Sequence, residues 1–249
     1  MNLLAQASQV GYDPSGTPEI YTSQNPFVRN TSSILPGVDL TSIPVVGRGI
    51  LISPTTVMRA WHNGQSQTGE PYTFVEQDGT VHTRTQISRS DQLGQDLVVH
   101  VLDQPLPPSI NPMQIFPSTL PQYLGDVRPY CYRVTYTNQH VLSLGDFVVE
   151  TDSAGTRIDQ DEITGNNHWV EAVGGDSGGA IFLVLDGIPF ALAATLNVGE
   201  EGSASHIHSH LLTSEYGAIS FDLRRSIYNS TPPEPQGEGD QSTIFIRRR

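Results

Sequence analysis

Short stretches in which apolar and polar residues alternate recur along most of the chain, and Gly, Pro or Asn residues separate them. A period of two is typical of β-strands, because successive side chains of a strand point to opposite faces. Two alternating segments, 72–76 and 80–86, flank Asp78-Gly79 and have the pattern of a hairpin. In the first half of the chain, strands are expected at 45–53, 55–60, 72–76, 80–86 and 96–102.

The second half of the chain repeats this pattern. Strands are expected at 128–136, 141–150, 169–173, 180–185 and 190–196. The polar residues between 152 and 167 are expected to form a loop, and the proline-rich segment 105–112 is expected to join the two halves. Segment 221–229 has no Gly or Pro and places Leu223 and Ile227 four residues apart, so it is predicted to be a short C-terminal helix. The predicted fold class is therefore all-β.

Composition agrees with many short strands. The chain has 249 residues, of which 37% are hydrophobic, 23 are Gly and 18 are Pro. This length is enough for one large or two small β-domains with a buried core. Residues 1–40 are rich in Gly, Pro, Asn, Ser and Thr and are interpreted as an extended N-terminal lead-in. Residues 230–249 are rich in Pro, Gly and Glu and are predicted to form a mobile C-terminal tail.

Charge limits the classes of partner. The formal net charge is −13 at pH 7, which argues against nucleic acid and anionic membrane surfaces as partners. No apolar run is long enough to span a membrane. Residues 1–10 lack the charged and apolar regions of an intact signal peptide, but Leu4-Ala5-Gln6-Ala7 has small residues spaced like the end of one. We therefore expect a secreted or periplasmic protein.

Cys131 is the one cysteine of the chain, so an intrachain disulfide is excluded. The fold must then be held together by its core and its hydrogen bonds. Cys131 lies in an alternating segment, 130–134, and is interpreted as a packed thiol rather than a nucleophile.

A serine surrounded by glycines is the strongest chemical signal in the sequence. Ser177 lies in Gly174-Gly175-Asp176-Ser177-Gly178-Gly179. Glycine lacks a Cβ, so it permits positive φ angles and lets a substrate backbone approach closely. Such a loop can direct the N–H groups of Gly175 and Ser177 at one point, where a developing oxyanion would lie. An ordinary Gly/Ser-rich turn is the simpler interpretation of the loop taken alone.

The string Gly-Asp-Ser-Gly-Gly at 175–179 resembles the nucleophile loop of the trypsin/chymotrypsin-like serine proteases. His62 follows a predicted strand in which Val57 and Ala60 match the family's motif before its catalytic base, although Trp61 and Arg59 replace small residues of that motif.

Asp96 opens Asp-Leu-Val-Val, which is similar to the family's Asp-Ile-Ala-Leu strand. The order His62, Asp96, Ser177 is the order of this family and differs from the orders in subtilisin-like enzymes and α/β-hydrolases. Because a serine hydroxyl needs a base and the base needs an orienting group, the resemblance implies a catalytic triad.

The resemblance covers roughly residues 41–229 and implies two antiparallel six-stranded β-barrels, at about 41–110 and 125–220. It also implies a serine endopeptidase that cleaves a polypeptide substrate through an acyl-enzyme, with His62 as the base, Asp96 as its orienting group and Ser177 as the nucleophile. No metal or other cofactor is needed for this chemistry. The oligomeric state stays open.

In this family the residue six positions before the nucleophile lies at the base of the primary specificity pocket, and here that residue is Glu171. Other substrate-binding candidates are Ala172, Ala193, Ala194, Thr195 and Leu196. A carboxylate at the pocket base implies preference for a basic side chain. The alternatives are a small apolar pocket with Glu171 turned outward, or an acidic preference that uses His206, His208 or His210.

Those three histidines alternate, so a strand would place them on one face, where they could also bind zinc. An ordinary polar strand face is the simplest interpretation of them. The aspartate before the nucleophile, here Asp176, often pairs with a newly freed N-terminus in this family, but no Ile-Val-Gly-Gly sequence precedes His62.

Two other functions compete with the endopeptidase. The first is a non-catalytic binding or structural module of the same fold, which Trp61 favours, and the second is an esterase that uses the same triad.

Overall fold

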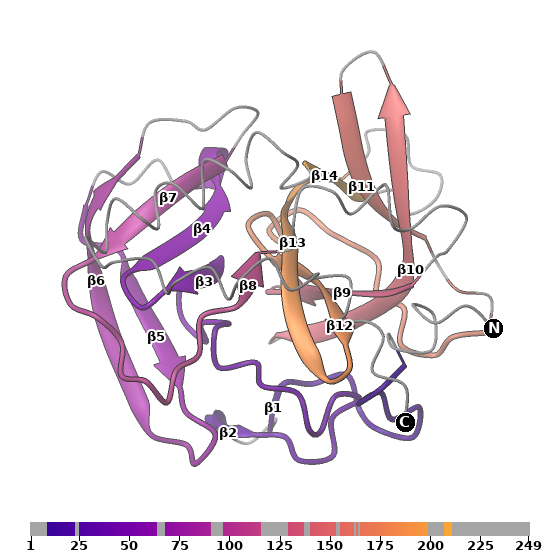
Figure 1. Cartoon of the computed structure of the whole chain (residues 1–249), viewed down its shortest axis with the longest axis horizontal. Coiled ribbons are helices and arrows are strands. Elements are labelled where there is room, and N and C mark those ends of the chain that lie inside the picture. Colours follow the sequence, from indigo (N-terminus) through magenta and orange to yellow (C-terminus); the bar gives the residue numbers. More distant parts are fainter. Residues whose placement is uncertain are drawn as a thin grey trace, which may run out of the picture.

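The structure, a computed structural model, describes residues 9–22, 25–63, 68–90, 97–115, 129–136, 140–152, 155–161, 163, 165–198 and 207–210. Within these ranges the regular structure is β-strand, apart from one short 3₁₀ turn, Trp61–Asn63 (η1). The predicted all-β fold class is confirmed. Figure 1 shows two main groups of strands side by side, one from each half of the chain.

The first half of the chain forms a five-stranded antiparallel sheet in the order β3-β4-β7-β6-β5. Its strands are β3 (Ile50–Ser53), β4 (Thr56–Ala60), β5 (Pro71–Val75), β6 (Val81–Arg89) and β7 (Leu97–Leu102). The predicted hairpin at Asp78-Gly79 is confirmed, because β5 pairs with β6 from Pro71↔Thr85 to Val75↔Val81. An isolated bridge between Val46 and Thr73 links the segment before β3 to β5, so this sheet curls towards its own far edge.

The second half forms a seven-stranded sheet in the order β12-β9-β10-β11-β14-β13-β8. Its strands are β8 (Gln114–Ile115), β9 (Tyr130–Thr135), β10 (Val141–Asp152), β11 (Gly155–Asp161), β12 (Ala180–Leu185), β13 (Ile188–Val198) and β14 (Ile207–His210). Because β12 pairs with both β9 and β13, the pairings of all these strands except β8 close on themselves.

Two predictions in the second half are wrong. The segment expected to be a loop between 152 and 167 contains β11, which pairs with β10 from Asp146↔Asp161 to Asp152↔Gly155, so backbone pairing forms this strand despite its polar residues. The strand expected at 169–173 is irregular. Side chains bind its backbone instead: Val170 N–H donates to Ser143 Oγ over 3.0 Å, and the Val170 carbonyl accepts from Ser143 Oγ and Arg133 Nη2.

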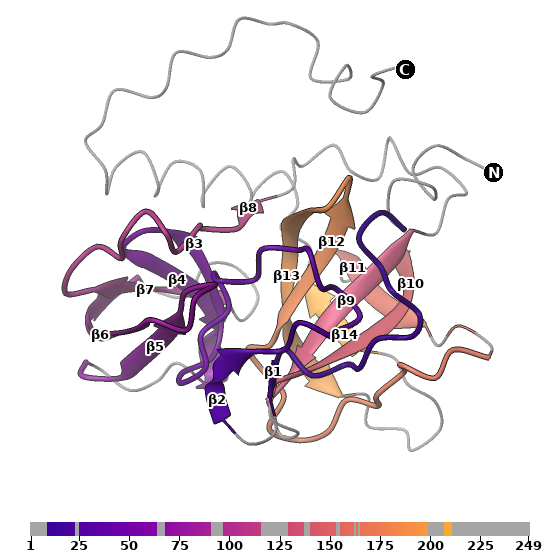
Figure 2. The ribbon, with the colours of Figure 1, turned by 90° about the horizontal axis from the view of Figure 1, so that it is seen from below.

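The N-terminal segment packs across both sheets. It contains a small hairpin, β1 (Tyr21–Thr22) and β2 (Asn25–Arg29), and in Figure 2 the indigo chain of these residues passes along the two groups of strands. Ile20, Ile34 and Ile43 are buried in the same cluster as residues of both sheets. The segment therefore contributes to the core that holds the two sheets together.

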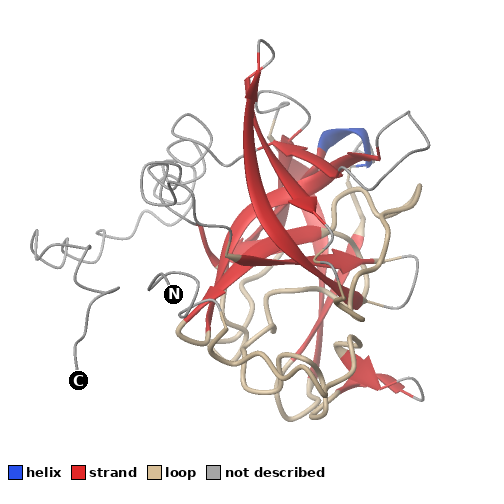
Figure 3. Ribbon diagram, turned by 90° about the vertical axis from the view of Figure 1, so that its right-hand side faces the viewer, coloured by secondary structure: helices blue, strands red, loops and turns tan. Residues whose placement is uncertain are grey.

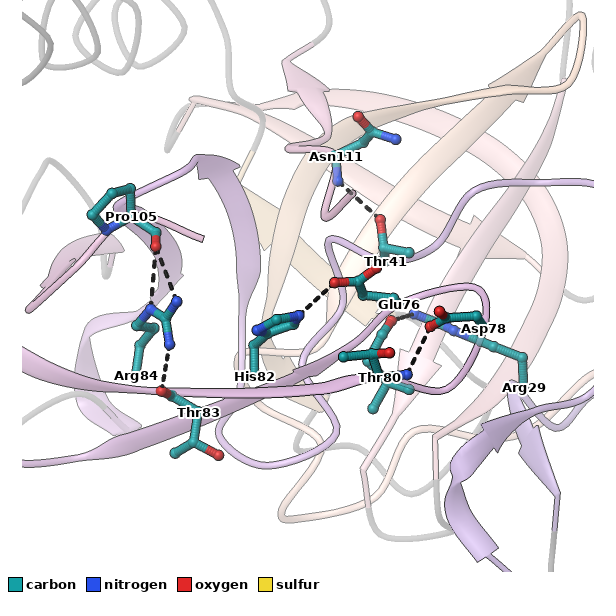
Figure 4. Close-up of polar contacts among 11 residues, drawn as sticks. Arg29, Thr41, Glu76, Asp78, Thr80, His82, Thr83, Arg84, Pro105 and Asn111 are labelled. Atoms are coloured by element: carbon teal, nitrogen blue, oxygen red, sulfur yellow. Dashed lines mark hydrogen bonds and ion pairs between the residues drawn. The ribbon is translucent and has the colours of Figure 1, made fainter. Parts of the chain in front are cut away.

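Polar contacts reinforce this packing around the β5–β6 hairpin (Figure 4). Arg29 Nη2 donates to the Val75 carbonyl over 2.7 Å, and His82 Nε2 lies 2.5 Å from Glu76 Oε1. The Asn111 N–H donates to Thr41 Oγ1 over 3.0 Å, which joins the segment before β3 to the segment that leads to the second sheet. The predicted helix at 221–229 and the tail lie outside the described residues.

Candidate active site

The Ser177 loop is built from two consecutive turns between the irregular segment and β12. Asp176 N–H donates to the Val173 carbonyl over 3.0 Å, and Gly179 N–H donates to the Asp176 carbonyl over 2.9 Å. Gly175 has a φ of 108° and Gly178 a φ of 86°, and residues other than glycine rarely adopt these values. The glycines therefore permit the fold of the loop, and they leave Ser177 half-buried and Gly175 exposed.

Asp176 anchors this loop from below. Its side chain is 1% exposed, and its carboxylate accepts hydrogen bonds from Tyr136 N–H at 3.0 Å and Val173 N–H at 3.1 Å. Arg133 Nη1 lies 3.5 Å from Asp176 Oδ2, and Arg133 is fully buried on β9. The cationic partner of Asp176 is therefore an arginine side chain of the same chain.

Burial and this ion pair act on Arg133 in opposite directions. Burial lowers the pKa of Arg133 to about 10, and the nearby Asp176 carboxylate offsets part of that shift. The guanidinium stays charged at neutral pH because this value lies well above 7. A charged ion pair that is buried away from water therefore holds Asp176, the residue before Ser177, in place.

His62 lies at the end of a buried strand. β4 is buried along its whole length, and the chain then turns through η1, which Figure 3 colours as helix. Within that turn Trp61 is half-buried and His62 is exposed. The sequence pattern therefore correctly predicted that a strand delivers His62 at a turn.

Asp96 lies outside the described residues, and the next residue, Leu97, begins β7. β7 runs antiparallel to β4, and Leu97 is the register partner of Ala60. The chain therefore enters β7 at the same end of the sheet at which it leaves β4 towards His62. This register brings two of the three predicted triad segments to one end of one sheet.

The Ser177 loop meets that same end of the sheet. A methyl group added to Gly178 would lie 3.8 Å from the Ala60 backbone nitrogen and 3.9 Å from Arg59 Cβ. Tyr136 joins the two sheets at this point, because its N–H binds Asp176 while its hydroxyl donates to the Gly49 carbonyl at 3.3 Å. The segments that carry His62 and Ser177 are therefore neighbours across the two sheets.

A largely buried polar cluster surrounds Arg59 at the end of β4, the strand that precedes His62. Arg59 Nη1 is 2.5 Å from Glu70 Oε1 and 3.1 Å from the Tyr72 hydroxyl, which in turn is 2.8 Å from His100 Nδ1. Arg59 is 2% exposed, so this ion pair ties the end of β4 to the segment before β5. On the outer side, the Arg89 guanidinium lies 4.6 Å from the centre of the Trp61 ring.

The predicted specificity residues fall into two groups. Glu171 is exposed and Ala172 is buried, so the Glu171 carboxylate stays largely hydrated and gains little from pairing with a basic side chain. Ala193, Ala194, Thr195 and Leu196 belong to β13, where Ala194 pairs with Ala180 and Ala193 with Ile181. This pairing sets β13 beside the strand that directly follows the Ser177 loop.

Two of the three alternating histidines are described, on β14, where His208 pairs with Asn197 and His210 with Arg157. His206 lies outside the described residues. In the part of the chain that the structure describes, no group of three or more His, Cys, Asp or Glu residues could hold a metal ion. The same residues contain no helix long and apolar enough to cross a membrane.

Sequence reasoning missed Arg133 and Tyr136. The signal was present, because an arginine in the apolar run Tyr-Cys-Tyr-Arg-Val-Thr must find a partner if the strand is buried. The sequence did not show that this partner is Asp176. Cys131, the neighbour of Tyr132, is fully buried and its thiol pKa is raised by burial, which fits the packed thiol that was predicted.

Comparisons with known proteins give the fold alone. No family model and no curated protein sequence matches the chain. Among solved structures, the passenger domain of plasmid encoded toxin, an autotransporter enterotoxin from enteroaggregative Escherichia coli, is similar with a TM-score of 0.57 and 13% identity. The match covers 87% of this chain and 26% of that chain, so this chain spans about a quarter of the other's length.

Proposed function

We propose that the protein is a serine endopeptidase of the trypsin/chymotrypsin type that uses His62, Asp96 and Ser177. One observation carries the proposal. The Ser177 loop packs against the backbone of Ala60, which lies two residues before His62 and pairs with Leu97, the residue after Asp96. Three segments far apart in sequence thus converge on one end of the five-stranded sheet, each with the side chain that acyl transfer needs.

In the proposed mechanism His62 takes the proton of Ser177 as its hydroxyl attacks the substrate carbonyl. Asp96 holds the imidazole in the required tautomer and stabilises the imidazolium. His62 then protonates the leaving amine, and water repeats the cycle on the acyl-enzyme. None of these steps calls for a metal or an organic cofactor.

The N–H groups of Gly175 and Ser177 would bind the oxyanion. The exposed position of Gly175 and its positive φ support this role, because the loop backbone there is open to a ligand. The buried Arg133–Asp176 pair holds the loop in one conformation before substrate arrives. Preorganised donors of this kind usually make the largest single contribution to rate enhancement in acyl transfer.

The proposal includes the finer fold, two six-stranded barrels. The closed ring of pairings in the seven-stranded sheet supports it for the second half. In the first half, the bridge from Val46 to Thr73 supports a sheet that closes through the segment before β3. Which side chain the primary pocket accepts stays a prediction, as does the secreted or periplasmic location.

Covalent labelling tests the proposal. A biotinylated peptidyl phosphonate or a sulfonyl fluoride should label the wild-type protein on Ser177, which peptide mapping would identify. Ser177→Ala should remove the label, and Ser15→Ala should not, because Ser15 is an exposed serine that bonds Asp13. Circular dichroism checks that each variant is folded. An unlabelled but folded wild-type protein would instead support the non-catalytic module.

Turnover separates the remaining alternative. An endopeptidase should cleave internal peptide bonds of a denatured proteome, whereas an esterase should hydrolyse activated esters and leave peptides intact. Asp96→Asn should reduce peptide turnover by about 10⁴-fold, because the histidine would then adopt the wrong tautomer.

A further inference from the structure

Arg48 occupies a fixed place beside the proposed nucleophile. It lies between two glycines with positive φ, Gly47 at 85° and Gly49 at 131°. A methyl group on Gly47 would lie 2.5 Å from the Tyr72 ring, and one on Gly49 would lie 2.4 Å from the Met58 carbonyl. Because both neighbours are packed this tightly, the backbone of Arg48 has little freedom to move.

This placement brings Arg48 next to the residue that follows Ser177. A methyl group on Gly178 would lie 3.4 Å from Arg48 Cβ. The Arg48 side chain is half-buried, and its guanidinium lies 6.0 Å from the centre of the Tyr136 ring. The Cβ of Arg48 therefore lies beside Gly178, the residue that follows the proposed nucleophile.

Arg48 differs from the two arginines that form ion pairs near the proposed site. Arg133 has Asp176 and Arg59 has Glu70 within ion-pair distance. In the described ranges of the chain, the Arg48 guanidinium lies over the Tyr136 ring and no carboxylate pairs with it. A guanidinium that no carboxylate neutralises can bind the carboxylate of a ligand locally, although the chain as a whole carries a net charge of −13.

The sheet to which each proposed contact belongs indicates whether Arg48 lies on the acyl side or on the leaving-group side of the substrate. Glu171 and β13, the proposed pocket for the acyl part, belong to the half of the chain that forms the seven-stranded sheet. His62, which would protonate the leaving amine, follows β4, and Arg48 comes just before β3, the neighbour of β4. The leaving peptide should therefore lie on the same side as Arg48.

We propose that Arg48 forms a subsite for an acidic side chain on the leaving-group side of the cleaved bond, so that the substrate is an acidic peptide. This inference rests on the proposed endopeptidase function. A guanidinium binds a carboxylate through two parallel hydrogen bonds, which gives geometric selectivity over an amide. At a half-exposed position we expect about a fivefold preference in kcat/KM for Glu over Gln.

The test uses matched peptides. A sequence that the wild-type protein cleaves is resynthesised with Glu, Gln or Lys at the first or second position after the cleaved bond. The wild type should cleave a Glu peptide about fivefold faster than the Gln peptide, and it should cleave the Lys peptide more slowly than the Gln peptide. Arg48→Gln should abolish this ranking, and raising the salt concentration should weaken it in the wild type.

Two control variants make the result specific. Arg84→Gln removes the same charge from the five-stranded sheet, where the Arg84 guanidinium binds the Pro105 carbonyl, and should keep the preference. Arg89→Gln removes the arginine stacked on Trp61 and should keep it also. Loss of the preference in Arg89→Gln, with retention in Arg48→Gln, would overturn the assignment to Arg48.

Phosphonate labelling separates this inference from the function on which it rests. The probe fills only the acyl side, so Arg48→Gln should still label on Ser177. A wild-type protein that labels on Ser177 but cleaves Glu and Gln peptides equally overturns the subsite alone. A folded wild-type protein that neither labels nor cleaves overturns the endopeptidase and the subsite together.

Discussion

Replacing Arg133 by methionine should destabilise the protein more than most substitutions. Methionine keeps much of the side-chain volume but leaves the Asp176 carboxylate buried without its cation. Removing one partner of a buried ion pair costs roughly 3–5 kcal/mol. The Tyr136 and Val173 N–H groups still bind the carboxylate, so we expect the lower end, about 3 kcal/mol.

Urea unfolding, followed by tryptophan fluorescence, measures this change, and thermal unfolding should show a midpoint lower by roughly 6–12 °C. Arg84→Met is the matched control and should cost under about 1 kcal/mol, because the Arg84 guanidinium binds the backbone carbonyls of Pro105 and Thr83. The double variant Arg133→Met with Asp176→Asn removes both charges and should be more stable than the sum of the single effects predicts, by at least about 1 kcal/mol.

Two results would refute this reasoning. Arg133→Met within about 1 kcal/mol of the wild type would mean that the pair contributes little to the folded state. Strict additivity in the double variant would mean that Arg133 and Asp176 act through different contacts.

Three further predictions follow from the site and its surroundings. Burial lowers the pKa of His140 to about 4 from an unfolded value near 6.5. Neutral His140 therefore contributes about 3 kcal/mol to folding stability above pH 6.5, and this contribution is lost as the pH falls towards 4. The pH dependence of urea midpoints should flatten in His140→Gln. Ser177→Ala and His62→Ala should each abolish peptide turnover, and the double variant should lose no more than either one, as single-turnover kinetics would show. Glu171→Gln should leave cleavage of neutral esters unchanged and reduce cleavage after Lys or Arg only if the exposed carboxylate reaches the pocket.

Local pattern was sufficient for most strands. β12 begins and ends where the apolar run 180–185 does, and the hairpin at Asp78-Gly79 follows from turn chemistry. Local pattern gave the wrong prediction where tertiary contacts determine the backbone conformation. β11 exists because β10 offers it a backbone partner, and the segment 169–173 is irregular because Ser143 and Arg133 bind Val170.

For the candidate site, the chemistry that is available can be read from the residues alone: a serine among glycines, a histidine after an apolar strand and an aspartate before another. Residue types and local conformation are short-range properties, so a linear pattern carries them. The three-dimensional fold was needed to show that Gly178 lies next to Ala60, that Ala60 pairs with Leu97 and that Asp176 pairs with Arg133. These contacts depend on strand register and on packing between two sheets, where residues far apart in the chain exclude water together.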